Sequence, residues 1–163
     1  MSAATLRDAS LNRGGRTLWQ GLDLTVEPGE FIAVLGPNGS GKTSLLRLLL
    51  GQVPLTRGSM TVTGDLGYVP QHRLADNALI LHKRRCDAQT AVLFVTHEIN
   101  PIVPYVDRIL YLVDGRFQIG TVDEVMTTET LSELYRAQID VVKIRGQYVV
   151  VGETNECAEH AHE

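Results

Sequence analysis

The sequence predicts an α/β fold in which a mainly parallel sheet is flanked by antiparallel strands, and three observations support this prediction. Residues 31–35 and 91–95 are uninterrupted apolar runs, typical of strands that are buried on both faces of a parallel sheet. A glycine-rich loop at 36–41 separates the first run from a helix expected at 43–50. Further along the chain, short apolar segments alternate with turn residues, as they do in antiparallel hairpins.

Three more strands are expected before residue 70. Residues 22–26 alternate between apolar and polar side chains, which predicts a strand with one buried face. Residues 59–63 and 66–69 flank a Gly-Asp pair, and this pattern predicts a hairpin. Gly51 follows the helix expected at 43–50 and is placed to end it in the left-handed conformation.

Two hairpins are expected in the last third of the chain. Residues 109–113 and 117–119 flank Asp114 and Gly115, a pair typical of tight hairpin turns. Residues 141–144 and 148–151 are expected to pair about a turn at Gly146.

Three helices besides 43–50 are expected. The polar and basic residues 73–89 favour a surface helix, and residues 123–126 and 129–135 have short amphipathic patterns. Thr128 is the candidate N-cap of the last helix.

The composition favours one ordinary globular domain at residues 1–152, followed by an acidic tail at 153–163 that we expect to be disordered. A net charge of -4 provides no basic surface for nucleic acid, so no nucleic-acid partner is expected. No apolar stretch approaches the ~20 residues of a membrane span, and the start of the chain lacks a secretory signal pattern. With two cysteines and no disulfide framework, a cytoplasmic location is the simplest expectation.

The loop after residues 31–35 matches the phosphate-binding motif G-x-x-x-x-G-K-[ST] at every constrained position. Its glycines let successive backbone N–H groups point at an anion, and the helix that follows adds its positive dipole end. Lys42 is expected to reach the β and γ phosphates of a nucleotide, Thr43 to bind Mg²⁺ and Ser44 to contact a phosphate oxygen. The candidate nucleotide-binding residues are Gly36, Pro37, Asn38, Gly39, Ser40, Gly41, Lys42, Thr43 and Ser44. The motif predicts a P-loop nucleoside triphosphatase (NTPase) core that binds ATP and Mg²⁺.

Several segments around this loop resemble the ATP-binding cassette (ABC) family in register. They are residues 26–30, 36–43, 45–49, 58–59, 68–71, 95–98 and 107–115. The resemblance covers about residues 5–150, and the stretch 96–116 is most similar to cassettes that energise the uptake of manganese, zinc or related metal ions. It implies an ATP-binding subunit that works with a transporter membrane subunit, and with a second ATP-binding subunit, at the cytoplasmic face of the membrane.

The resemblance also implies roles for three single residues. Gln71 corresponds to a Mg²⁺ and water contact that senses the membrane subunit, and His97 to a switch histidine that contacts the γ-phosphate and serves catalysis. Arg13 stands where the family often has an aromatic residue that stacks on adenine, and its planar guanidinium can stack in the same way. Taken alone, Gln71 reads as a surface side chain, His97 as a structural histidine and Arg13 as a solvated arginine.

Two parts of the family pattern are missing from the sequence. There is no Leu-Ser-Gly-Gly-Gln type signature, and there is no second acidic strand whose carboxylates would hold Mg²⁺ water and polarise the attacking water. Asp114 precedes a glycine and is turn chemistry, while Asp123 and Glu124 begin a helix, so we assign a catalytic role to none of the three.

The spacing between Gln71 and His97 predicts why these parts are missing. The two residues are 26 positions apart (97 minus 71), and the family places a helical subdomain, the signature and the acidic strand between them. We therefore expect a shortened ABC-type core with an internal deletion on the order of 80 residues near residues 74–81, the size of a small domain.

Three functions follow from this pattern. The first is the ATP-binding subunit of a metal-ion transporter, with ATP binding retained and hydrolysis impaired, because phosphoryl transfer depends on the missing carboxylates. The second is a non-catalytic nucleotide-binding module that regulates a full-length cassette. The third is a small P-loop kinase with residues 83–85 as a lid.

Overall fold

The computed structural model describes residues 2–63, 66–69 and 90–152 of the 163-residue chain. The helix expected at 73–89, the junction expected at 74–81, Gln71 and the tail at 153–163 lie outside the described residues. Within the described part, no helix is long and apolar enough to cross a membrane.

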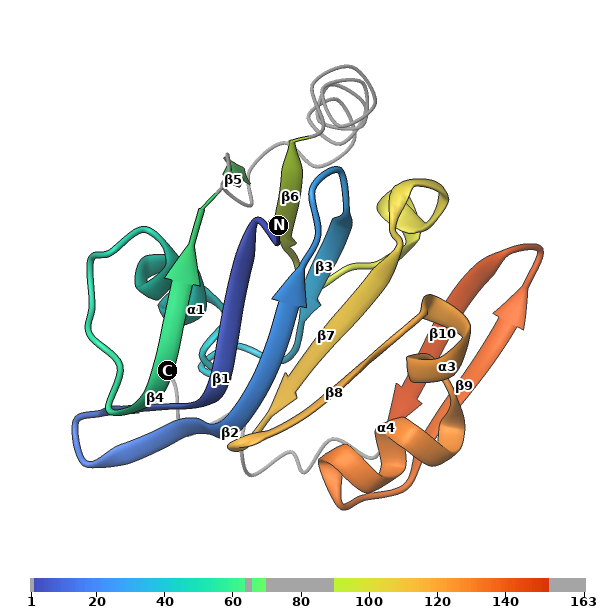
Figure 1. Cartoon of the computed structure of the whole chain (residues 1–163). Helices are drawn as coiled ribbons and strands as arrows, with labels where there is room; N and C mark the ends of the chain where they lie inside the picture. The colour runs from blue at the N-terminus through green and yellow to red at the C-terminus, as the bar shows by residue number, and fades with distance from the viewer. Residues whose placement is uncertain (1, 64–65, 70–89, 153–163) are drawn as a thin grey trace.

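Five strands form the central sheet, in the order β5-β6-β3-β7-β8 (Figure 1). Their bounds are Phe31–Leu35 for β3, Leu66–Val69 for β5, Ala91–Val95 for β6, Arg108–Val113 for β7 and Arg116–Gly120 for β8. β5, β6, β3 and β7 pair in parallel, and β8 pairs antiparallel with β7. The predicted α/β class with a mainly parallel sheet is therefore confirmed.

A second sheet of three antiparallel strands lies beside the first, in the order β2-β1-β4. Its strands are Ala4–Arg13 for β1, Arg16–Val26 for β2 and Arg57–Val62 for β4. The sequence predicted only parts of β2 and β4 and missed β1. β1 shifts register against both neighbours and Asp8 has a positive φ of 47°, so bulges interrupt the alternation by which a strand is recognised.

The core has two halves, one on each face of β3. Ile32 and Val34 pack with helix α1 (Lys42–Leu49) and with the antiparallel sheet, whereas Phe31, Ala33 and Leu35 pack on the opposite face. Every residue of β3 and β6 is buried. The uninterrupted apolar runs are explained by this burial on both faces.

The hairpin expected between residues 59–63 and 66–69 is wrong. β4 pairs with β1 and β5 pairs with β6, so the two segments belong to different sheets. The Gly-Asp pair between them is a local turn signal, and tertiary pairing of each segment with an earlier or later strand overrides it.

The remaining elements cover the second face of the central sheet. They are η1 (Asn100–Tyr105), α3 (Val122–Val125), α4 (Thr128–Tyr135) and the hairpin of β9 (Ile139–Ile144) with β10 (Gln147–Gly152). The hairpins predicted about Asp114-Gly115 and about Gly146 are confirmed. The predicted cap of α4 is wrong by one residue: the Thr127 hydroxyl accepts from the Thr130 N–H at 3.1 Å, while Thr128 bonds Val141.

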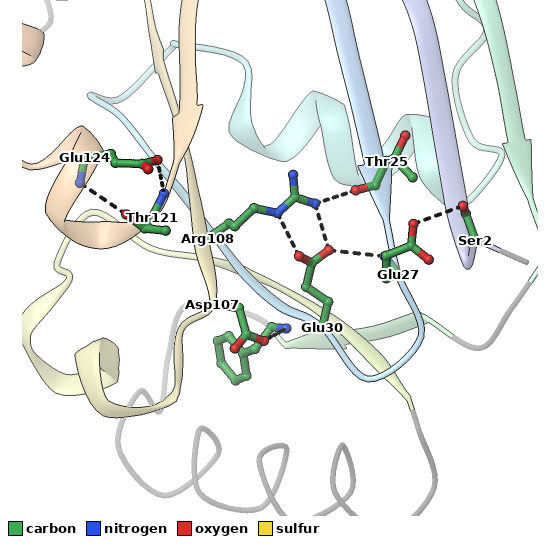
Figure 2. A network of polar contacts seen from close by, with 9 residues as sticks. Ser2, Thr25, Glu27, Glu30, Asp107, Arg108, Thr121 and Glu124 are labelled. Atoms are coloured by element: carbon green, nitrogen blue, oxygen red, sulfur yellow. Dashed lines mark hydrogen bonds and ion pairs between the residues drawn. The ribbon is translucent and has the colours of Figure 1, made fainter.

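A polar network closes the amino end of β3 and β7 (Figure 2). Nε and one terminal nitrogen of Arg108 each donate to Glu30 at 2.7 Å, and the same terminal nitrogen donates to the Thr25 carbonyl. Asp107 accepts from the Phe31 N–H at 2.8 Å. Because of the Glu30 carboxylate, the pKa of Arg108 is raised. This network ties the turn between β2 and β3 to the start of β7.

Candidate functional site

The glycine-rich loop lies at the carboxyl end of the central sheet. β3 ends at Leu35, and residues 36–41 lead directly into α1. Gly41 is the N-cap of α1 without a side-chain cap, and the first turn has no acidic residue. The backbone N–H groups and the positive dipole end of α1 are therefore available to an anion.

The glycines of the loop are required by its geometry. Gly36 has φ +148°, and a Cβ on it would lie 2.2 Å from the Leu112 carbonyl oxygen. Gly41 has φ +97°, and a Cβ on it would lie 3.0 Å from Cδ1 of Trp19 and 3.2 Å from Cβ of Leu18. Any other residue at these two positions would displace the backbone that carries the candidate site.

Lys42 is held inside the loop. Its side chain is buried, with 4% of the residue exposed, and Nζ donates to the Gly36 carbonyl oxygen at 2.5 Å. Burial lowers the pKa of Lys42 from its ordinary value. One hydrogen bond uses one of the three ammonium donors, so the group retains capacity for an anionic ligand.

A pocket of about 240 Å³ opens in front of these groups. It is lined by Leu18, Asn38, Gly39, Gly41, Lys42, Thr43 and Ser44. The structure thus brings together most of the predicted loop residues, with the Thr43 side chain exposed at the first turn of α1. Gly36, Pro37 and Ser40 form the base of the same loop, and Ser40 is buried.

Two residues of β2 near the loop were missed by sequence reasoning. Leu18 lines the pocket, and Nη1 of Arg16 lies 4.0 Å from the position a Cβ on Gly39 would take. Alternation alone would not have revealed them, because the buried residues of β2 change phase between Leu22 and Trp19, where Gly21 has a positive φ of 65°. Arg13 is exposed on the opposite side of the β1–β2 turn, paired with Arg16, and does not line the pocket.

His97 lies at the same edge of the sheet but in a neighbouring pocket. Val95 is in register with Val34, and the Thr96 N–H donates to the Val34 carbonyl at 3.1 Å, so His97 leaves the sheet beside the start of the loop. Its exposed side chain lines a cavity of about 310 Å³ together with Leu35, Glu98, Tyr111 and Tyr148, among others. Gln71, the other residue expected here, lies outside the described residues.

No aspartate or glutamate is among the described residues that line the pocket in front of Lys42. Asp114 has φ +46° in the β7–β8 turn and faces Arg16 at 3.9 Å. Glu124 closes a capping box with Thr121, and Asp123 accepts from the Tyr148 hydroxyl at 2.5 Å. Asp114 thus lies in a turn, Glu124 takes part in a helix cap, and Asp123 accepts a partly buried hydrogen bond from Tyr148.

Comparison with known proteins shows which family and which curated proteins this chain is similar to. The family model described as ABC transporter matches residues 19–142. Over 93 residues the chain is 41% identical to the zinc import ATP-binding protein ZnuC of Jannaschia sp. (strain CCS1), a match that covers 56% of this chain and 38% of that protein. It is also 41% identical over 88 residues to the cytochrome c biogenesis ATP-binding export protein CcmA of Nitrobacter winogradskyi, covering 54% and 42%. The chain thus spans less than half the length of these curated relatives.

Solved structures share the fold. A chain of an ABC transporter described as of metal-chelate type, in an inward-facing conformation, superposes with a TM-score of 0.70 at 17% identity, covering 96% of this chain and all of that one. CbiO1 of Clostridium perfringens, part of the ABC transporter complex cbiONQ, gives a TM-score of 0.63 at 14% identity, covering 81% and 93%. The family match spans more than half of the chain and includes the loop, Lys42 and His97, and we conclude that this protein belongs to the ABC transporter family.

Proposed function

We propose that this chain is an ATP-binding subunit of a metal-ion uptake transporter that binds MgATP at the phosphate loop and hydrolyses it poorly. The observation that carries the proposal is the joint geometry of the loop: an uncapped helix start, a buried Lys42 aimed into the loop, and a pocket lined by backbone and hydroxyl donors. Such a site favours phosphate groups because its donors are fixed and its net local charge is positive.

The residues present fit ATP and Mg²⁺. Lys42 would exchange its bond to the Gly36 carbonyl for the β and γ phosphates, and the N–H groups of 39–43 would cradle them. The exposed Thr43 hydroxyl has the hard oxygen that Mg²⁺ prefers, and Ser44 follows it in the pocket. When bound, Mg²⁺ would neutralise phosphate charge, and the family resemblance adds Gln71 as a further contact.

The lining of the pocket in front of Lys42 supports the proposal of poor hydrolysis. The described lining residues contain no carboxylate to orient an attacking water, and His97 lines a different pocket. Loss of one well-placed electrostatic or acid-base group typically costs 10²–10³ in rate. Binding depends on one loop and one helix and does not require the missing groups.

Metal ions as the transported substrate are supported by the zinc import relatives at 39–45% identity over about half of the chain. The partner we propose is a transporter membrane subunit, and a second ATP-binding subunit would complete the pair. The chain would then act at the cytoplasmic face of the membrane without entering it.

Calorimetric titration of MgATP into the wild type and Lys42→Ala tests the proposal. We expect saturable binding that Lys42→Ala weakens at least ~100-fold, because charge-assisted contacts with phosphate are lost. Arg47→Ala is the matched control, since it removes an exposed positive charge from the last turn of the same helix. Equal affinity in the wild type and Lys42→Ala would show that the loop is not the binding site.

A further inference from the structure

Trp19 packs against the inner side of the phosphate loop. It is fully buried in β2, opposite Leu11 of β1, and it forms a bridge to Gly115 in the β7–β8 turn. Its ring lies so close to Gly41 that a Cβ there would be 3.0 Å from Cδ1 and 3.2 Å from Nε1. Trp19 therefore connects the antiparallel sheet to the β7–β8 turn through its backbone and to the start of α1 through its side chain.

Two buried polar atoms on this inner side have no hydrogen-bond partner among the residues that the structure describes. They are the indole Nε1 of Trp19 and Oγ of Ser40, which would lie 2.8 Å from a Cβ on Gly36. Buried donors are almost always paired in folded proteins. The unpaired atoms lie near the two ends of the same loop, 36–41, so packing of the indole, and not a hydrogen bond from either side chain, supports the loop on this side.

We propose that Trp19 is a positioning residue of the phosphate loop, holding Gly41 and the first turn of α1 in place for phosphate. The consequence of this positioning for phosphate binding rests on the function proposed above. Trp19 does not touch the pocket, so it acts through the backbone of Gly41. A rigid support lowers the ordering cost of binding, because the N–H groups already point at the ligand.

Trp19→Phe tests the positioning role with the least risk to folding, since it keeps a buried ring. Phe31→Leu is the matched control: Phe31 is equally buried but belongs to the other half of the core, at the amino end of β3. Hydrogen exchange without nucleotide should be at least about 10-fold faster at the amides of 36–44 in Trp19→Phe and unchanged there in Phe31→Leu. Equal loop exchange in the two variants would overturn the proposal.

Affinity and fluorescence test the link to nucleotide. MgATP should bind about 10-fold more weakly to Trp19→Phe than to Phe31→Leu, the size of effect produced by small misplacements of a site. Trp19 is the only tryptophan in the chain, so its fluorescence emission should change when MgATP is titrated into the wild type. The dissociation constant from this fluorescence change should equal the one from calorimetry, and the emission of Lys42→Ala should stay constant. Unchanged affinity in Trp19→Phe would overturn the proposal.

The proposed binding of MgATP and the positioning role of Trp19 can be contradicted independently of each other. If the wild type binds no MgATP while loop exchange is accelerated only in Trp19→Phe, the proposed function is wrong and the positioning role of Trp19 is supported. If the wild type binds MgATP and Lys42→Ala does not, but Trp19→Phe and Phe31→Leu behave alike in both assays, the positioning role is wrong and the proposed function is supported.

Discussion

The two ends of the central sheet differ in how their polar groups are satisfied. At the amino end, Arg108 makes three hydrogen bonds to Glu30 and Thr25, and Asp107 accepts from the Phe31 N–H (Figure 2). At the carboxyl end, α1 starts without a side-chain cap, Lys42 is buried with a bond to one backbone carbonyl, and Ser40 Oγ has no partner among the described residues.

The difference separates a structural end of the sheet from a binding end. A network whose charged groups are paired with one another stabilises the fold and attracts a ligand less. Donors that are fixed but unsatisfied lower stability and favour a ligand that pairs with them. Four predictions test this contrast, from the largest expected effect to the smallest.

The first prediction concerns turnover at the binding end. Steady-state ATP hydrolysis should be at least ~100-fold slower than in a full-length relative such as the zinc import protein of Jannaschia sp.. The reason is that the described residues lining the pocket include hydrogen-bond donors for phosphate but no carboxylate to orient the attacking water. A phosphate-release assay under excess MgATP measures this rate. His97→Ala should change the residual rate little, whereas robust turnover that is lost in both His97→Ala and Lys42→Ala would contradict the prediction.

The second prediction concerns the close packing around Gly36 in the loop. Gly36→Ala should lower the free energy of unfolding by at least about 2 kcal/mol, since its Cβ would lie 2.2 Å from a backbone carbonyl and nearby atoms must shift. Gly146→Ala has a positive φ of 77° but open space around it, so it should lose only about 1 kcal/mol. Urea denaturation measures both, and equal losses would mean that the loop yields easily.

The third prediction concerns the structural end. Arg108→Met should cost about 2 kcal/mol of unfolding free energy, because Glu30, only 15% exposed, would lose its charged partner. Arg57→Met is the control: its pair with Asp8 is mostly exposed, and the loss should be under about 0.5 kcal/mol. MgATP affinity should stay unchanged in both variants. A large loss of affinity in Arg108→Met would show that the two ends are coupled.

The smallest effect is expected for Lys42→Met in the nucleotide-free protein. Burial lowers the pKa of Lys42, so the folded state disfavours the charged amine relative to the unfolded chain. Replacing Lys42 by Met should leave the thermal midpoint at pH 7 unchanged or raise it by no more than about 4 °C, while nucleotide binding is lost.

The difference in stability between Lys42→Met and the wild type should depend on pH. Between the lowered pKa of Lys42 and its ordinary value of 10.5, the unfolded chain binds more protons than the folded one, so the contribution of Lys42 to stability rises with pH. The advantage of Lys42→Met should therefore shrink as pH rises through the lowered pKa. Melting curves from pH 7 to 10 measure it, and a gap that widens with pH would contradict the sign.

Local signals predicted the parts of this molecule that are determined locally. The apolar runs of β3 and β6, the phosphate motif between β3 and α1, and the Asp114-Gly115 turn each depend on residues close in sequence. Gly51 shows the same: it has φ +76° and its N–H bonds the Leu48 carbonyl, ending α1 as expected.

Features determined by distant contacts were missed. β4 and β5 were expected to pair with each other because a Gly-Asp pair lies between them. This local signal does not depend on β1 or β6, which are the strands that β4 and β5 pair with. The role of Trp19 could not be seen either, since it depends on the approach of β2 to Gly41 from across the core. At the site, the structure places most of the predicted loop residues around one pocket, whereas Leu18 and Arg16 became visible only once β2 was placed.

The position of β3 inside the sheet has an evolutionary consequence. β3 is enclosed by β6 and β7, and β5 reaches it only through β6. Parallel strands present equivalent hydrogen-bonding edges, so a strand can be gained or lost on the β5 side of β6 without altering the register of β3 with β6 and β7. A change of chain length between residues 69 and 90 therefore does not by itself alter the strand that carries the phosphate loop, so relatives can share this loop and still differ in the length of that segment.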